Sequence, residues 1–96
     1  MAKEVNPIER KISMVAAASE ALIYRKKNPA CDSDRVLQHI SKNVAIGKDE
    51  ITKMGMIAAA TEAITISQKN PALNEKDVIR RVMDNLPGLI GNLGGF

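Results

Sequence analysis

Two glutamates, Glu20 and Glu62, are the residues whose surroundings most invite a chemical role. Each is embedded among alanines, in segments that are nearly alike: "MVAAASEALIYRKKNPA" begins at Met14 and "MIAAATEAITISQKNPA" begins at Met56. Two carboxylates brought together between helices would make a metal or proton site. Metal sites in helical bundles usually add a histidine or further carboxylates, and neither glutamate has one three or four residues later. We therefore expect structural roles for both glutamates, and no metal site.

The only histidine and the only cysteine do not complete a site either. A zinc site needs three or four ligands, which Cys31 and His39 alone do not supply, so we expect His39 to be a surface residue. The second segment has Leu73 in the place of Cys31, which favours a small buried hydrophobe over a nucleophile. The chain has no Ser-His-Asp order, no glycine-rich phosphate loop and no CxxC. We expect a protein that is not an enzyme and carries no cofactor.

Basic side chains suggest a nucleic-acid partner as the alternative function. The segment "YRKK" supplies Arg25, Lys26 and Lys27, and Arg80 and Arg81 would extend it into an anion-binding surface. These cations also have a structural explanation, because cations stabilise a helix C-terminus. No aromatic residues lie between them to stack on bases, which argues against nucleic-acid binding. A long helix followed by a turn and the segment "NEKDV" is similar to half of a histone fold. The nucleic-acid-binding alternative is therefore a chromatin-like protein. The short first helix of that fold is missing, and we assign no family.

The C-terminal segment "LPGLIGNLGGF" is the third candidate site. It holds four of the six glycines and the only phenylalanine, and glycine makes a segment costly to order. Its apolar residues recur at steps of one and three: Leu89, Ile90, Leu93 and Phe96. We expect these residues to bind a partner, either folded back over one end of the domain or inserted into a groove on another copy or another protein.

Length and composition predict one small helical domain. The chain has 96 residues, 45% of them hydrophobic and only 2% aromatic, so its core must be aliphatic and its helices closely spaced. No apolar run approaches the roughly 20 residues of a membrane span, and no signal-peptide stretch is present, so we expect a cytoplasmic protein that binds no membrane. The net charge of +3 permits an anionic partner without requiring one.

An internal repeat predicts the architecture. Residues 11–44 align with residues 53–86 without a gap, and 13 of the 34 positions are identical. We infer a tandem duplication of an αα-hairpin. The predicted parts are a first hairpin (8–44), a linker (45–48), a second hairpin (49–86) and a glycine-rich tail (87–96).

Turn and capping residues predict where the helices begin and end. Each "NPA" should end a long helix, because the residue before proline leaves the α region and asparagine tolerates a left-handed cap. Asp32 or Ser33 should cap a second helix that continues to Val44, and Asn74 should cap the fourth. These signals give each hairpin one long and one short helix.

The alanine runs predict how the helices pack. Three consecutive alanines at 16–18 sweep about 200° of helix surface, so the first helix needs close neighbours on more than one flank. We expect Ala17 and Ala59 to meet where the two long helices cross about a pseudo-twofold axis, with the short helices outside. Alternatively, the hairpins open and pair between chains.

These observations together favour a non-enzymatic helical interaction or assembly module that associates with itself. Nucleic-acid binding is the first alternative. A small ligand or metal between the long helices is the second.

Overall fold

The protein is described by a computed structural model over residues 7–91, with side chains over residues 8–86. This part of the chain contains helices and no strands, which confirms the predicted all-α class. Its elements are α1 (Pro7–Lys27), α2 (Ser33–His39), the π-helical turn η1 (Ile40–Val44), α3 (Glu50–Lys69) and α4 (Glu75–Gly91).

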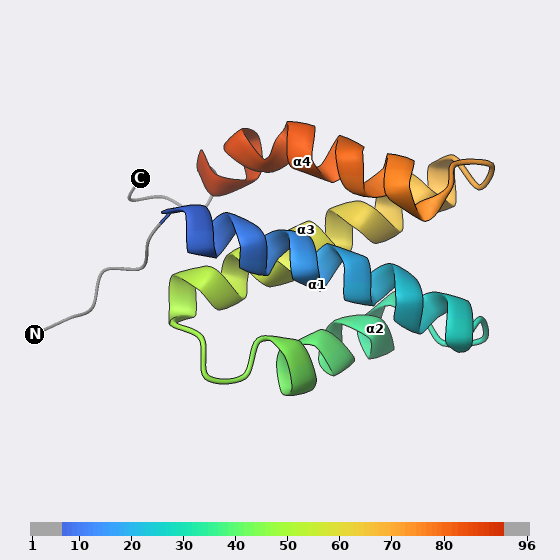
Figure 1. The fold of residues 1–96 in the computed structure, drawn as a ribbon. Coiled ribbons are helices and arrows are strands. Elements are labelled where there is room, and N and C mark those ends of the chain that lie inside the picture. Colours follow the sequence, from blue (N-terminus) through green and yellow to red (C-terminus); the bar gives the residue numbers. More distant parts are fainter. Residues whose placement is uncertain (1–6, 92–96) are drawn as a thin grey trace, which may run out of the picture.

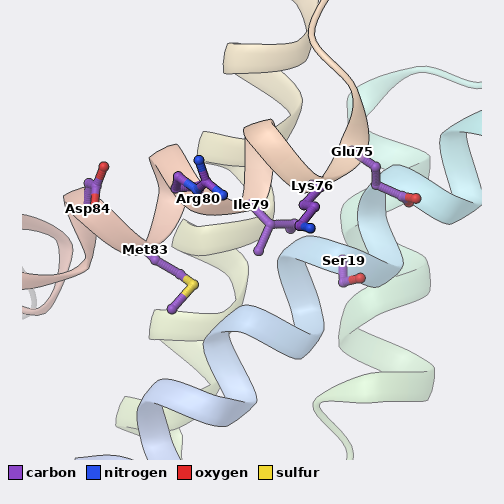
Figure 2. A pocket seen from close by; sticks show the side chains of 7 residues that line it. All are labelled: Ser19, Glu75, Lys76, Ile79, Arg80, Met83 and Asp84. Carbon is purple, nitrogen blue, oxygen red and sulfur yellow. The ribbon is translucent and has the colours of Figure 1, made fainter.

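The two long helices α1 and α3 form the centre of the molecule (Figure 1). They share the most extensive interface, while α2 and α4 lie on opposite sides of them, and the backbones of these two outer helices do not approach each other within the described residues. α4 runs antiparallel to α1 along the region enlarged in Figure 2. This is the arrangement that the alanine pattern predicts.

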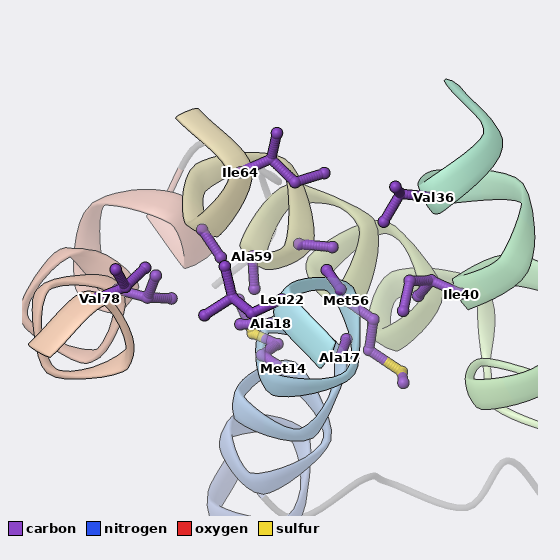
Figure 3. Close-up of a cluster of buried hydrophobic side chains, with 14 of the residues drawn as sticks. Met14, Ala17, Ala18, Leu22, Val36, Ile40, Met56, Ala59, Ile64 and Val78 are labelled. Atoms are coloured by element: carbon purple, nitrogen blue, oxygen red, sulfur yellow. The ribbon is translucent and has the colours of Figure 1, made fainter. Parts of the chain in front are cut away.

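Small side chains bring α1 and α3 into close contact. Ala17 and Ala59 are both fully buried and belong to the same core cluster. At Gly55 a Cβ atom would come within 3.0 Å of the Met14 Sδ atom, so this position has little room for a larger residue. Figure 3 shows the helices α2 and α4 adding side chains to this core from its two outer sides. Burial of this aliphatic seam stabilises the crossing of the two long helices.

Side-chain caps begin the two outer helices as predicted. The Asp32 Oδ1 atom accepts a hydrogen bond from the Arg35 backbone N–H at 2.9 Å, which identifies Asp32 as the cap of α2. The Asn74 Oδ1 atom accepts from the Asp77 backbone N–H at 2.8 Å. Each bond satisfies one of the donors that a helix N-terminus leaves without an intrahelical partner.

The two "NPA" turns end the long helices in the same way. The Asn28 Nδ2 group donates to the Tyr24 carbonyl at 3.1 Å, and the Asn70 Nδ2 group donates to the Ile66 carbonyl at 3.1 Å. No described residue other than glycine has a positive φ, so the expected left-handed cap is wrong. The amide side chains satisfy carbonyls of the last turn, which removes the need for that conformation.

The predicted second helix is interrupted by η1. The Ala45 backbone N–H donates to the Ile40 carbonyl at 2.8 Å, five residues earlier, as in a π-helix. Such a turn rotates by roughly 80° per residue instead of 100°, which brings Ala45 to the side of the helix that Ile40 occupies. Both residues are buried, so the wider turn adds Ala45 to the core.

A polar cluster fastens the start of α3 to α1. Asp49 caps α3 by accepting from the Thr52 backbone N–H at 3.2 Å and from the Thr52 hydroxyl. The Arg10 Nε–H donates to the Thr52 hydroxyl oxygen at 3.2 Å, and the Arg10 guanidinium lies 3.6 Å from the Asp49 carboxylate. The hydrogen bond from the Thr52 hydroxyl, helped by its backbone N–H and by Arg10, holds the pKa of Asp49 below its ordinary value of 3.8.

Candidate functional site

A groove runs along the surface between α1 and α4. Its larger part has a volume of ≈ 530 Å³, and Figure 2 shows Ile79 and Met83 extending from α4 on the side that faces α1. It is lined by Ser19, Glu75, Lys76, Ile79, Arg80, Met83 and Asp84. Ile79 and Met83 form an apolar floor, and the charged side chains around it form a rim with both positive and negative groups.

A second, almost wholly apolar hollow of ≈ 240 Å³ continues this groove. It is lined by Ile8, Lys11, Ile12, Val15 and Met83. Met83 borders both hollows, so they are adjacent, and we name the two together the α1–α4 groove. Its apolar side chains are unusually open, with Ile12 63% exposed and Met83 50% exposed. Large apolar side chains gathered at one exposed site often mark a binding surface.

Helical spacing explains how one helix serves both the core and the groove. Ile8, Ile12 and Val15 follow one another at steps of four and three, which places them along one side of α1. The fully buried Met14 and Ala17 lie on another side, against α3. α1 therefore carries two apolar surfaces, of which only one is covered within the described chain.

The positions that correspond to the groove residues under the repeat carry different side chains. Under the 42-residue shift, Met83 corresponds to Ser41 and Arg80 to Gln38, while Ile12 corresponds to Met54. The apolar residue that joins the two hollows of the α1–α4 groove is thus a serine in the other half. The groove takes one helix from each half of the chain, and its apolar junction at Met83 has no apolar counterpart at position 41.

The predicted basic residues are divided over the surface. Arg25 and Lys26 border a separate pocket of ≈ 400 Å³ near the start of α4, and Lys27 is exposed at the end of α1. Arg80 lines the α1–α4 groove, and Arg81 is exposed on α4. The carboxylate of Glu75 borders both the pocket and the groove, so an acidic group lies between the two sets of cations.

The predicted tail is in part a continuation of α4. The helix runs through Pro87 to Gly91, so the backbone at Leu89 and Ile90 is helical. A proline inside a helix removes one helical hydrogen bond, yet α4 continues through it, five residues beyond the predicted end at residue 86. Leu93 and Phe96 lie outside the described residues.

One polar contact joins residues that the sequence treats separately. The Glu20 Oε2 and His39 Nε2 atoms lie 2.8 Å apart, which links α1 to the end of α2. The Asn43 amide lies 3.3 Å from His39 Nδ1, and the Tyr24 ring packs edge-on at a centroid distance of 4.1 Å. If the amide donates to Nδ1, the proton sits on Nε2 and is donated to Glu20. His39 is therefore a half-buried helix connector, where the sequence predicts a surface residue.

The two glutamates that first suggested chemistry occupy different settings. Glu20 is paired with His39, whereas the corresponding residues Glu62 and Arg81 form no ion pair within the described chain. The described residues contain no group of three or more His, Cys, Asp or Glu side chains placed to hold a metal ion. Cys31 is half-buried and packs against the core, in line with its predicted role as a small hydrophobe.

Comparisons with protein families, curated proteins and solved structures give no match for this chain. Among the described helices, none combines the length and the apolar character needed to cross a membrane.

Proposed function

We propose that the protein is a non-enzymatic helical module that binds another protein through the α1–α4 groove. The observation that carries this proposal is the exposure of Ile12 and Met83 side by side in one groove with a charged rim. Two antiparallel helices leave a channel between them that accepts the apolar side of a third helix. An apolar centre with a polar rim is also the usual composition of a protein interface.

The side chains of the groove support binding more than catalysis. Its floor offers methylene, methyl and thioether groups, which pack but do not transfer protons. Its rim carboxylates, Glu75 and Asp84, are exposed to water and have no histidine beside them. The one histidine–carboxylate pair, Glu20 with His39, connects α1 to α2 and contributes nothing to the groove lining.

We also infer that the two hairpins arose by duplication and are related by a pseudo-twofold axis. The two turns support this proposal, because the Asn28 carbonyl accepts from the Cys31 N–H at 3.0 Å and the Asn70 carbonyl accepts from the Leu73 N–H at 2.9 Å. The side-chain amides of both asparagines make the same contact to the preceding helix. The duplication would have supplied two similar hairpins, and the α1–α4 groove, which takes one helix from each hairpin, would have specialised afterwards.

Nucleic-acid binding remains the second candidate, because Arg25 and Lys26 border one pocket with the first turn of α4. A helix N-terminus attracts anions, which favours phosphate at that end of the pocket. Glu75 on the same border opposes it. Retention on DNA that falls with salt and is lost in Arg25→Ala would support this candidate, and no retention at low salt would remove it.

Site-directed photo-crosslinking tests the protein-binding proposal. A photoreactive phenylalanine analogue is placed at position 12 in the groove, or at position 54, where Met54 is 50% exposed on α3. We expect a protein adduct from position 12 that is absent or much weaker from position 54, identified by mass spectrometry after irradiation in cells. Equal labelling from both positions, or no protein adduct from position 12, would contradict the proposal.

A further inference from the structure

We propose that the partner of the α1–α4 groove is a second copy of this chain, bound in a symmetric dimer. This inference rests on the proposed function and names the occupant of the same groove. In the dimer, α1 of each copy lies over α4 of the other. Each apolar floor then covers the other one, as a self-complementary twofold interface requires.

The charges beside the apolar floor favour this occupant. Lys11 lines the groove from α1, and Asp84 lines it from α4. When α1 of one copy faces α4 of the other, Lys11 comes opposite Asp84 of the second copy. The twofold axis repeats this pairing, so one interface gains two cation–carboxylate pairs.

The remaining rim charges make a strongly charged partner a poor fit. Lys76 and Arg80 on the rim are offset by Glu75, and all three are exposed. A highly acidic or highly basic segment would meet repulsion from part of this rim.

The size of the surface predicts the strength of the dimer. α1 and α4 have 21 and 17 residues, which correspond to helices of about 31 Å and 25 Å in length. With a width of about 10 Å for each helix, the contact would bury on the order of 500 Å² on each copy. This is near the lower end for specific interfaces, so association should be reversible and depend on concentration in the micromolar range or above.

Sedimentation equilibrium of the full chain over a wide concentration range is the first test. We expect the average mass to rise from monomer towards dimer. Met83→Ser, which installs the residue of the other hairpin, should weaken dimerisation at least tenfold. Met54→Ser is the matched control, because Met54 and Met83 are each 50% exposed, and it should change dimerisation less than twofold. Equal effects of both substitutions would overturn the proposal.

A charge exchange between two variants is the second test. Asp84→Lys and Lys11→Asp should each weaken self-association, because like charges then face each other across both contacts. An equimolar mixture should dimerise again, since the Asp84→Lys chain presents two lysines to the two aspartates of the Lys11→Asp chain. Circular dichroism of each variant verifies that the helices are retained. Failure of the mixture to associate would overturn the assigned pairing.

Two further outcomes separate this inference from the proposed function. A chain that stays monomeric at every concentration, but crosslinks from position 12 to a different protein, overturns the dimer and leaves protein binding in place. A monomeric chain that dimerises only after removal of residues 92–96 assigns the groove to the chain's own C-terminal segment, which also overturns the dimer. A crosslink from position 12 to a second copy supports it.

Discussion

At the scale of single residues, Asp49 is the group whose ionisation is most clearly coupled to folding. Its pKa is lowered in the folded protein, chiefly by the Thr52 hydroxyl and with help from Arg10. The charged form therefore stabilises the fold fully above the ordinary value of 3.8, and this contribution is lost as the pH falls through the lower folded pKa.

Asp49→Asn should consequently lower the free energy of unfolding at neutral pH by less than about 1 kcal/mol, because the carboxylate is exposed to solvent. Urea denaturation at neutral pH and at a pH well below 3.8 should show the difference from the wild type shrinking at the acidic pH. A difference that stays constant or grows on acidification would contradict this account of the helix cap.

His39 supplies the second prediction at this scale, because it joins α2 to α1 through Glu20 and Tyr24. His39→Ala should lower the free energy of unfolding by about 1 kcal/mol, as expected for a half-buried hydrogen bond plus a ring contact. Gln38 is an exposed neighbour on the same helix, and Gln38→Ala should change stability by less than about 0.5 kcal/mol. Equal losses for the two variants in urea denaturation would show that the contact contributes nothing.

At the scale of the helix, the seam between α1 and α3 depends on small side chains. Ala17 is fully buried against α3, whereas its neighbour Ala16 is exposed. Ala17→Leu should destabilise the protein by about 1–3 kcal/mol, because an overpacked core must shift backbone or rotamers. Ala16→Leu should stay within about 0.5 kcal/mol of the wild type in thermal denaturation. A larger loss of stability in Ala16→Leu than in Ala17→Leu would show that the contact between α1 and α3 does not include Ala17.

At the scale of the whole molecule, each long helix packs most extensively against the long helix of the other half of the chain. α1 buries its alanines mainly against α3, which belongs to the other half of the chain. Fragments 1–48 and 49–96 should each show weak helical circular dichroism, because short helices without packing are marginal in water. Their equimolar mixture should recover the helical signal. A fragment that is fully helical as a monomer would contradict this mutual dependence.

The sequence by itself determined the helical class, the residues that cap the two outer helices, and the alanine contact between the two central helices. The reason is physical: capping at Asp32 and Asn74, the "NPA" turns and the spacing of apolar residues act over a few positions. The repeat strengthened each of these signals, because the residues needed for folding occur twice in the chain.

Only the tertiary structure decided which surfaces remain exposed to solvent after the helices have packed. The Glu20–His39 contact joins two consecutive helices, and the α1–α4 groove lies between the first and the last helix, so both depend on how the helices pack. The turn η1 depends on packing around Ala45, and no local signal marks it. Ile12 is apolar and lies at helical spacing from other apolar residues, as a core residue would. In the packed structure it is nevertheless 63% exposed, which no short stretch of sequence specifies.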